Sequence, residues 1–147
     1  MKLLRMISLV LGSVFLLTSM LSTAQAQEHV TAVAPQEYLD MENPYDVDDV
    51  EDAFLKKVKR VYKSKCSKCH GSSGDGEGSA AEDILIKPTA FGDEGYMDSK
   101  SDGQLYWILE FGSEGTEMEA YGPDSDAGFS EDRMWQLITY MRANFTN

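Results

Sequence analysis

Cysteine, histidine, proline and positive charge are all scarce in this chain. Its 147 residues contain two cysteines, two histidines and four prolines, and 13 basic residues stand against 25 acidic ones. Two cysteines are too few for the disulfide framework of a small secreted domain, and a structural zinc site usually takes four Cys or His ligands. The acidity argues against nucleic-acid binding and against adsorption to anionic lipid, because both surfaces would repel the chain.

Long hydrophobic runs are also scarce. The one apolar run, residues 6–21, is shorter than the ~20 residues that a bilayer-spanning helix needs. Lys2 and Arg5 precede it, and Ala24-Gln25-Ala26 follows as a small-residue cleavage site. This layout predicts a secretory signal peptide over residues 1–26. The mature chain is therefore expected in the periplasm or an equivalent extracytoplasmic compartment, without stable membrane insertion and more acidic than the full-length net charge of −12.

Both cysteines stand in one pentapeptide, Cys66-Ser67-Lys68-Cys69-His70, and C-x-x-C-H is the spacing at which haem is attached covalently. The two thiols can form thioethers to haem vinyl groups, while the imidazole of His70 binds the iron as its proximal ligand. A thioredoxin-like pair needs a βαβ setting, and no β-branched run precedes the motif. Zinc would have only His29 as a fourth ligand, and a small disulfide would leave His70 without a role. The motif predicts one covalent haem c.

The pattern of apolar residues predicts one all-α domain, residues 48–147, behind an arm. The arm, residues 27–47, lacks periodicity and contains Pro35 and Pro44, so it is expected to be extended and either wrapped around the domain or disordered. Apolar residues recur at helical spacing in the domain. Its three helices are expected from the N-cap Asp48 to Cys66, from the capping box Ser101–Gln104 to Gly112, and from Ser130 to the C-terminus.

From about Val50 onward, the chain resembles the class I, mono-haem cytochromes c of bacterial exported type. Tyr62 matches the aromatic residue that these proteins carry four positions before the first cysteine, and Leu137-Ile138-Thr139-Tyr140 matches the core pattern of their last helix. The resemblance implies a fold in which the first and last helices cross and pack around one haem. Val58 stands where the family usually has a small residue, so the helix axes are expected to lie further apart.

The resemblance also implies a methionine as the distal iron ligand. Met118 lies in a loop after a glycine turn and ahead of the last helix, where the family places this ligand, so Met118 is predicted to bind the iron. Met97 is the alternative. Met134 and Met141 fall on the core stripe of the last helix and are expected to pack. Family loops often have proline directly after the ligand, whereas this chain has Glu119.

One-electron transfer, rather than catalysis, is the function that the resemblance implies. With His70 and Met118 bound, the iron would have no open position for a substrate. The family uses a carbonyl from a Pro-containing segment to accept the free ring N–H of the proximal histidine, so Pro88 is the expected acceptor. Two other functions stay open. They are a haem sensor or peroxidase-like protein with a labile sixth ligand, and a fixed electron-transfer subunit of a larger oxidoreductase.

The donor and acceptor are expected to be redox proteins. The acidity of the chain predicts a partner with a basic docking patch. Glu114, Glu117 and Glu119 surround Met118 and are expected to ring the haem edge. The alternative is that the acidic surface only keeps an exported protein soluble.

Overall fold

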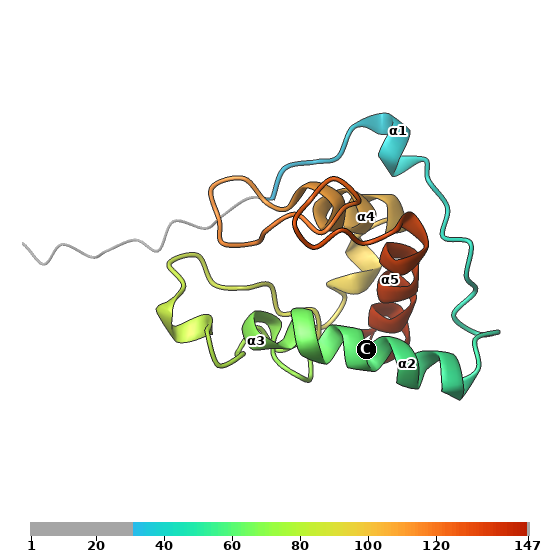
Figure 1. The fold of residues 1–147 in the computed structure, drawn as a ribbon, viewed down its shortest axis with the longest axis horizontal. Helices are drawn as coiled ribbons and strands as arrows, with labels where there is room; N and C mark the ends of the chain where they lie inside the picture. Colours follow the sequence, from blue (N-terminus) through green and yellow to red (C-terminus); the bar gives the residue numbers. More distant parts are fainter. Residues whose placement is uncertain (1–30, 147) are drawn as a thin grey trace, which may run out of the picture.

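The computed structural model describes residues 31–146, and its regular structure in this range is helical (Figure 1). Three longer helices form the frame: α2 (Asp52–Lys65), α4 (Asp102–Phe111) and α5 (Glu131–Phe145). Short helical turns connect them: α1 (Gln36–Leu39), α3 (Ser67–His70), η1 (Ala81–Asp83) and η2 (Met97–Ser99). No strand occurs among the described residues, which confirms the predicted all-α class. None of these helices has the length and apolar character needed to cross a membrane. The predicted signal peptide lies outside the described residues.

Helix α2 begins later than the sequence predicts. The predicted N-cap Asp48 lies outside the helix, which starts at Asp52 with Glu51 as its N-cap and no side-chain cap. The Asp46 carboxylate accepts a hydrogen bond from the Asp48 N–H, and the Asp46 carbonyl accepts one from the Asp49 N–H. This side-chain-to-backbone turn offers the backbone an alternative to helix, and it delays the helix start.

Helices α2 and α5 cross and pack against each other, as the resemblance implies (Figure 1). Val58 is 2% exposed, so the branched side chain at the family's small-residue position lies inside the core. Tyr62 is fully buried, and its ring centroid lies 5.4 Å from that of Tyr140 and 5.2 Å from that of Phe145. These aromatic contacts hold the C-terminal half of α2, and the motif that follows it, against α5.

The starts of α4 and α5 agree with the sequence. Ser101 Oγ accepts a hydrogen bond from the Gln104 N–H at 3.1 Å, and Ser130 Oγ accepts one from the Arg133 N–H at 3.3 Å. Each serine thereby satisfies one otherwise unpaired N–H of a helix start. Helix α4 ends at Phe111, and its C-cap Gly112 has a φ of 76°, which suits glycine. The capping box is only half formed, because the Gln104 side chain binds elsewhere.

The partner of that side chain is the arm, whose described part lies along α4 (Figure 1). The buried Gln104 amide holds it at two points. The Ala34 N–H donates to Oε1 at 2.8 Å, and Nε2 donates to the Ala32 carbonyl at 3.0 Å. Helix α1 then sits directly on the first turn of α4, where a Cβ on Gly103 would come within 1.7 Å of the Tyr38 carbonyl oxygen. The described part of the arm therefore wraps the domain.

Candidate cofactor site

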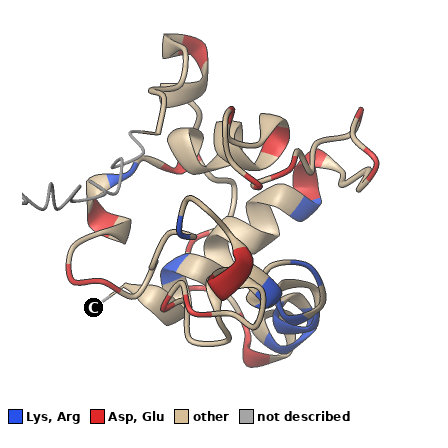
Figure 2. Cartoon of the chain, turned by 90° about the vertical axis from the view of Figure 1, so that its left-hand side faces the viewer, with Lys and Arg blue, Asp and Glu red and all other residues tan. Residues whose placement is uncertain are grey.

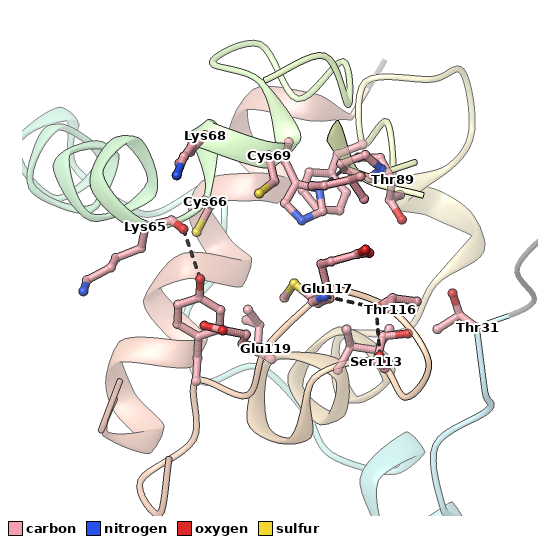
Figure 3. Close-up of a pocket in the computed structure, with 18 of the residues that line it drawn as sticks. Thr31, Lys65, Cys66, Lys68, Cys69, Thr89, Ser113, Thr116, Glu117 and Glu119 are labelled. Carbon is pink, nitrogen blue, oxygen red and sulfur yellow. Dashed lines mark hydrogen bonds between the residues drawn. The ribbon is translucent and has the colours of Figure 1, made fainter. Parts of the chain in front are cut away.

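A cavity of about 370 Å³ lies between the C-x-x-C-H motif and the loop after α4 (Figure 3). Its volume falls within the ~300–1,000 Å³ typical of cofactor and small-molecule pockets. The end of α2, α3 and the segment 84–91 form one wall, and α4 with the loop 113–121 forms the opposite wall. Much of the lining is apolar and comes from Ile84, Ile86, Phe91, Leu105, Ile108, Leu109 and Met141.

The motif places its three chemically active side chains on one wall. Cys66 is the N-cap of α3, so Cys66, Cys69 and His70 share one helical turn at the cavity. Figure 3 shows both cysteine sulfurs directed into the cavity, and neither cysteine is in a disulfide. Burial raises the pKa of the Cys66 thiol to about 12, with a smaller contribution from Cys69. Redox-active thiols have lowered pKa values, so a thioredoxin-like role does not fit Cys66.

His70 is buried and held in one orientation. Its Nδ1 lies 3.0 Å from the Thr89 carbonyl oxygen, and its ring stacks on Phe91 with centroids 4.5 Å apart. With Nδ1 as the donor, Nε2 carries the free lone pair, which is the tautomer that a metal ligand needs. Burial lowers the pKa of His70, although the Thr89 carbonyl opposes this. The neutral imidazole is therefore the favoured form.

The carbonyl that holds His70 belongs to Thr89 and not, as predicted, to Pro88. The Pro88 carbonyl instead faces Gly76, where a Cβ would approach it to 2.6 Å. Gly78 is packed just as closely, because a Cβ there would lie 2.3 Å from the Lys68 carbonyl oxygen. The N–H groups of these two glycines also donate to carbonyls of the motif, at 2.9 and 3.0 Å. The chain's own backbone therefore fixes the motif wall.

Met118 lies on the wall opposite the motif. Its loop is a closed turn, in which the Ser113 N–H donates to the Met118 carbonyl at 2.9 Å and the Met118 N–H donates to Thr116 Oγ1 at 3.1 Å (Figure 3). Met97, in contrast, is 1% exposed in the core and is not among the described residues that line the cavity. Two thiols, an imidazole and two thioethers, those of Met118 in the loop and Met141 in α5, thus line one largely apolar cavity. This donor set fits a covalent haem c with His/Met ligation.

The sequence predicted no role for two of the residues that line the cavity. The Tyr121 hydroxyl donates to the Lys65 carbonyl at 3.0 Å and joins the loop after Met118 to the end of α2 (Figure 3). Thr31 also lines the cavity, so the arm contributes to its wall. Local periodicity carries no signal for either residue, because both act through segments far apart in the chain. The only sequence signal for Tyr121 was its place as an aromatic residue three positions after Met118.

The alternatives to haem find little support in the described range. No three His, Cys, Asp or Glu side chains among residues 31–146 converge on a point where they could hold a metal ion, so the zinc hypothesis has no ligand set there. His29, the fourth ligand that zinc would need, lies outside the described residues.

Comparison with known proteins agrees with this geometry. The family model described as "Cytochrome C oxidase, cbb3-type, subunit III" matches residues 53–141, which is more than half of the chain. The chain belongs to this family of class I, mono-haem cytochromes c. The match begins at the first turn of α2 and ends within α5, so it includes the motif, the cavity lining except Thr31, and most of both crossing helices of the cytochrome.

A solved structure similar to the cytochrome is a chain of the reducing HAO-like protein complex of Kuenenia stuttgartiensis, with 25% sequence identity and a TM-score of 0.54. The match covers 76% of the cytochrome and 54% of that chain, so the cytochrome spans about half the length of this neighbour. None of the curated proteins matches the cytochrome significantly. The family match confirms the predicted fold class.

Proposed function

We propose that this cytochrome is an exported one-electron carrier with one haem attached at Cys66 and Cys69 and with His70 and Met118 as the axial ligands. The observation that supports this proposal is the cavity, which has the imidazole on one wall and the thioether on the other. When bound, haem supplies a ferric/ferrous couple. The protein binds and orients it and controls how much water and charge surround it.

Each wall has a separate task in this proposal. The Thr89 carbonyl keeps Nε2 of His70 unprotonated and aimed, and the hydrogen bond raises the basicity of the ring. Leu105, Ile108 and Leu109 exclude water, and an apolar surrounding favours the less charged state of the couple. Negative charges at the rim act in the opposite direction, because they stabilise the oxidised state.

Three glutamates provide the docking site for a basic redox partner in this proposal. Glu114, Glu117 and Glu119 are exposed, and the last two line the cavity rim on either side of Met118 (Figure 3). Charge complementarity at such a rim raises the encounter rate and orients the partner. Interfaces of this kind are small, because a shuttle must also dissociate.

The extracytoplasmic location rests on the leader sequence, residues 1–26. N-terminal sequencing of the haem-loaded protein from a periplasmic fraction tests it. Mature protein that begins near Gln27 is the expected result. An intact leader on the haem-loaded protein would contradict export with cleavage.

A fixed subunit of a larger oxidoreductase is the second candidate. The solved structure that resembles the cytochrome is a chain of a protein complex, and the cytochrome matches about half of that chain. Size-exclusion chromatography of the natively expressed protein separates the two candidates. A free carrier elutes at the mass of a monomer, whereas a subunit elutes with its partner at all salt concentrations.

The test of His/Met ligation uses carbon monoxide and two methionine variants. The haem-loaded wild type is expected to show the weak ferric sulfur-ligation band in the red and to ignore carbon monoxide when reduced. Met118→Ala should lose the band and bind carbon monoxide, because the sixth position opens.

Met97→Ala is the matched control. It should keep the band, while its free energy of unfolding falls by about 2–5 kcal/mol because a core side chain is removed. Prompt carbon monoxide binding by the wild type would instead favour the sensor or peroxidase-like function. Loss of the band in Met97→Ala alone would overturn the assignment of Met118.

A further inference from the structure

Positive charge in this cytochrome is concentrated in one region. Seven of its 13 basic residues lie between positions 56 and 68, and no acidic residue occurs from Ala53 to Gly74. Figure 2 looks nearly along α2 and shows the blue segments gathered on that helix, while red segments are spread over the other elements. A chain with 25 acidic residues therefore keeps one region of opposite sign.

Six exposed cations form what we call the basic α2 surface: Lys56, Lys57, Lys59, Arg60 and Lys63 of α2, and Arg133 of α5. The one ion pair among the described residues joins Arg142 to Asp102, so none of these six cations is neutralised within residues 31–146. Exposed cations without an internal partner are available to an external one.

Helix stability does not explain this pattern. Lys56 lies one helical turn from Arg60, and the same spacing separates Lys59 from Lys63. Like charges at this spacing repel each other, whereas a glutamate at one of the two positions would create a stabilising pair. The helix C-terminus favours Lys63, and Asp52 one turn earlier favours Lys56. Neither effect reaches Lys59. Local helix energetics therefore do not account for this row of cations.

A groove between α2 and α5 lies within the basic α2 surface and has side chains that can bind carboxylates. It has a volume of about 300 Å³, and Lys57, Arg60 and Arg133 line it together with Ser64 and Gln136. The Arg133 guanidinium is positioned 5.7 Å from the centroid of the Phe129 ring. Arginine forks of this kind bind carboxylates with two parallel hydrogen bonds, so the groove can seat aspartate or glutamate side chains.

The net charge of −12 determines which kind of anionic partner, a membrane or a protein, suits the basic α2 surface. An extended anionic sheet, such as a lipid bilayer, would also meet the acidic remainder of the molecule and be repelled by it. At physiological salt, exposed charges act over about 8 Å, so a compact acidic patch on a protein meets mainly the basic α2 surface, with Glu131 and Asp132 as the exposed acids beside Arg133. Helix α2 also leads directly to Lys65, which lies with Lys68 at the motif side of the cavity (Figure 3).

We propose that the basic α2 surface docks an acidic redox protein. The cytochrome then has two docking sites of opposite sign, a basic one on the motif side and the acidic one around Met118. The two sites share no residue, so an acidic and a basic partner each have a site of their own. The binding itself does not depend on the proposed electron-transfer function. Only the purpose of the binding, which is electron transfer, rests on that function.

The test titrates the reduced, haem-loaded, ¹⁵N-labelled protein with a peptide of ten glutamates at low ionic strength. Amide shifts are expected along residues 56–63 and at the start of α5, and salt should reverse them. Lys57→Gln/Arg60→Gln should lower the binding constant, measured by isothermal titration, by roughly two- to thirty-fold, as the loss of two exposed charge contacts predicts. Both readouts are independent of electron transfer.

Lys100→Glu is the matched control, because it changes the net charge by the same two units outside the basic α2 surface. It should keep most of the peptide affinity. An equal loss in this control, peptide shifts outside α2 and α5, or no binding would overturn the proposal. Sedimentation with anionic phospholipid vesicles without peptide binding would also overturn it, in favour of a lipid surface. The carbon monoxide test judges the proposed function separately.

Discussion

On the motif side of the cavity, the chain runs from Ala53 to Gly74 without an acidic residue, and on the loop side it runs from Ser101 to Asp132 without a basic one. The cavity thus lies between a cationic and an anionic stretch of chain, although the whole molecule is strongly acidic. Net charge alone predicts one kind of partner. The distribution of the charge allows two.

The two walls also differ in how they are held. On the motif side, Gly76 and Gly78 pack against backbone, and their N–H groups bond to motif carbonyls. On the loop side, Gly115 has no atom within 4 Å of the position of a Cβ, and Glu114 and Glu117 are exposed. The motif wall is closely packed at these positions. The loop wall is packed at its base, where a Cβ on Gly112 would lie 2.5 Å from the Met118 carbonyl oxygen, and it is open at its tip, at Gly115.

The largest expected loss of stability comes from adding a methyl group to the motif wall, compared with the same addition to the loop wall. Gly78→Ala should lower the free energy of unfolding of the haem-loaded protein by about 3 kcal/mol, because its Cβ meets the Lys68 carbonyl and the backbone must shift. Gly115→Ala should lower it by only about 1 kcal/mol, the strain of a positive φ in open space. Chemical denaturation measures both. Equal losses would show that the walls do not differ in rigidity.

Removing the clamp on the arm tests what supports the loop-side wall. Gln104→Leu leaves the Ala34 N–H and the Ala32 carbonyl without their partner, so the free energy of unfolding should fall by about 1–3 kcal/mol. Gln36→Leu removes an exposed amide and should change it by less than about 0.5 kcal/mol. Limited proteolysis should cut the arm faster in Gln104→Leu. An arm protected equally in both variants would contradict the clamp.

Reversing the charge of the acidic rim tests whether the loop side of the cavity attracts cations. Glu114→Lys/Glu117→Lys/Glu119→Lys should slow electron exchange with cationic hexaammineruthenium(III) roughly tenfold at low ionic strength, because attraction becomes repulsion. Stopped-flow absorbance follows the reaction, and added salt should bring the wild-type and variant rates together.

The control for this change reverses three exposed acids away from the cavity. Glu37→Lys/Glu42→Lys/Glu94→Lys alters the net charge equally and should leave the rate within about twofold of the wild type, since these exposed acids do not line the cavity. An equal decrease in both triple variants would mean that net charge, and not the rim, controls the encounter.

The smallest expected effect concerns the one hydrogen bond from Tyr121 that joins the two walls. Tyr121→Phe removes the donor to the Lys65 carbonyl and should lower the free energy of unfolding by about 1 kcal/mol. If the bond also holds the loop that carries Met118, reduced Tyr121→Phe should bind carbon monoxide more readily than the wild type. An unchanged spectrum and unchanged stability would show that the walls are held together elsewhere.

Short-range patterns account for what the sequence predicted correctly. Periodicity and capping serines located α4 and α5, and the aromatic residue before the motif located the contact between α2 and α5. Errors arose where neighbouring groups competed for the same backbone. A turn at Asp46 takes up Asp48, so α2 starts later than predicted. The Pro88 carbonyl packs on Gly76, and the carbonyl of Thr89 accepts the hydrogen bond from His70 instead.

By itself, the sequence determined the helical class and the sign of the net charge and predicted a haem cofactor, because a 3.6-residue period, a charge count and a five-residue motif are local or additive properties. The tertiary structure decided which methionine lies opposite His70, that the arm wraps α4, and that the cations of α2 meet Arg133 in one groove. These facts depend on contacts between residues that are distant in the chain, and such contacts exist only once the helices have packed.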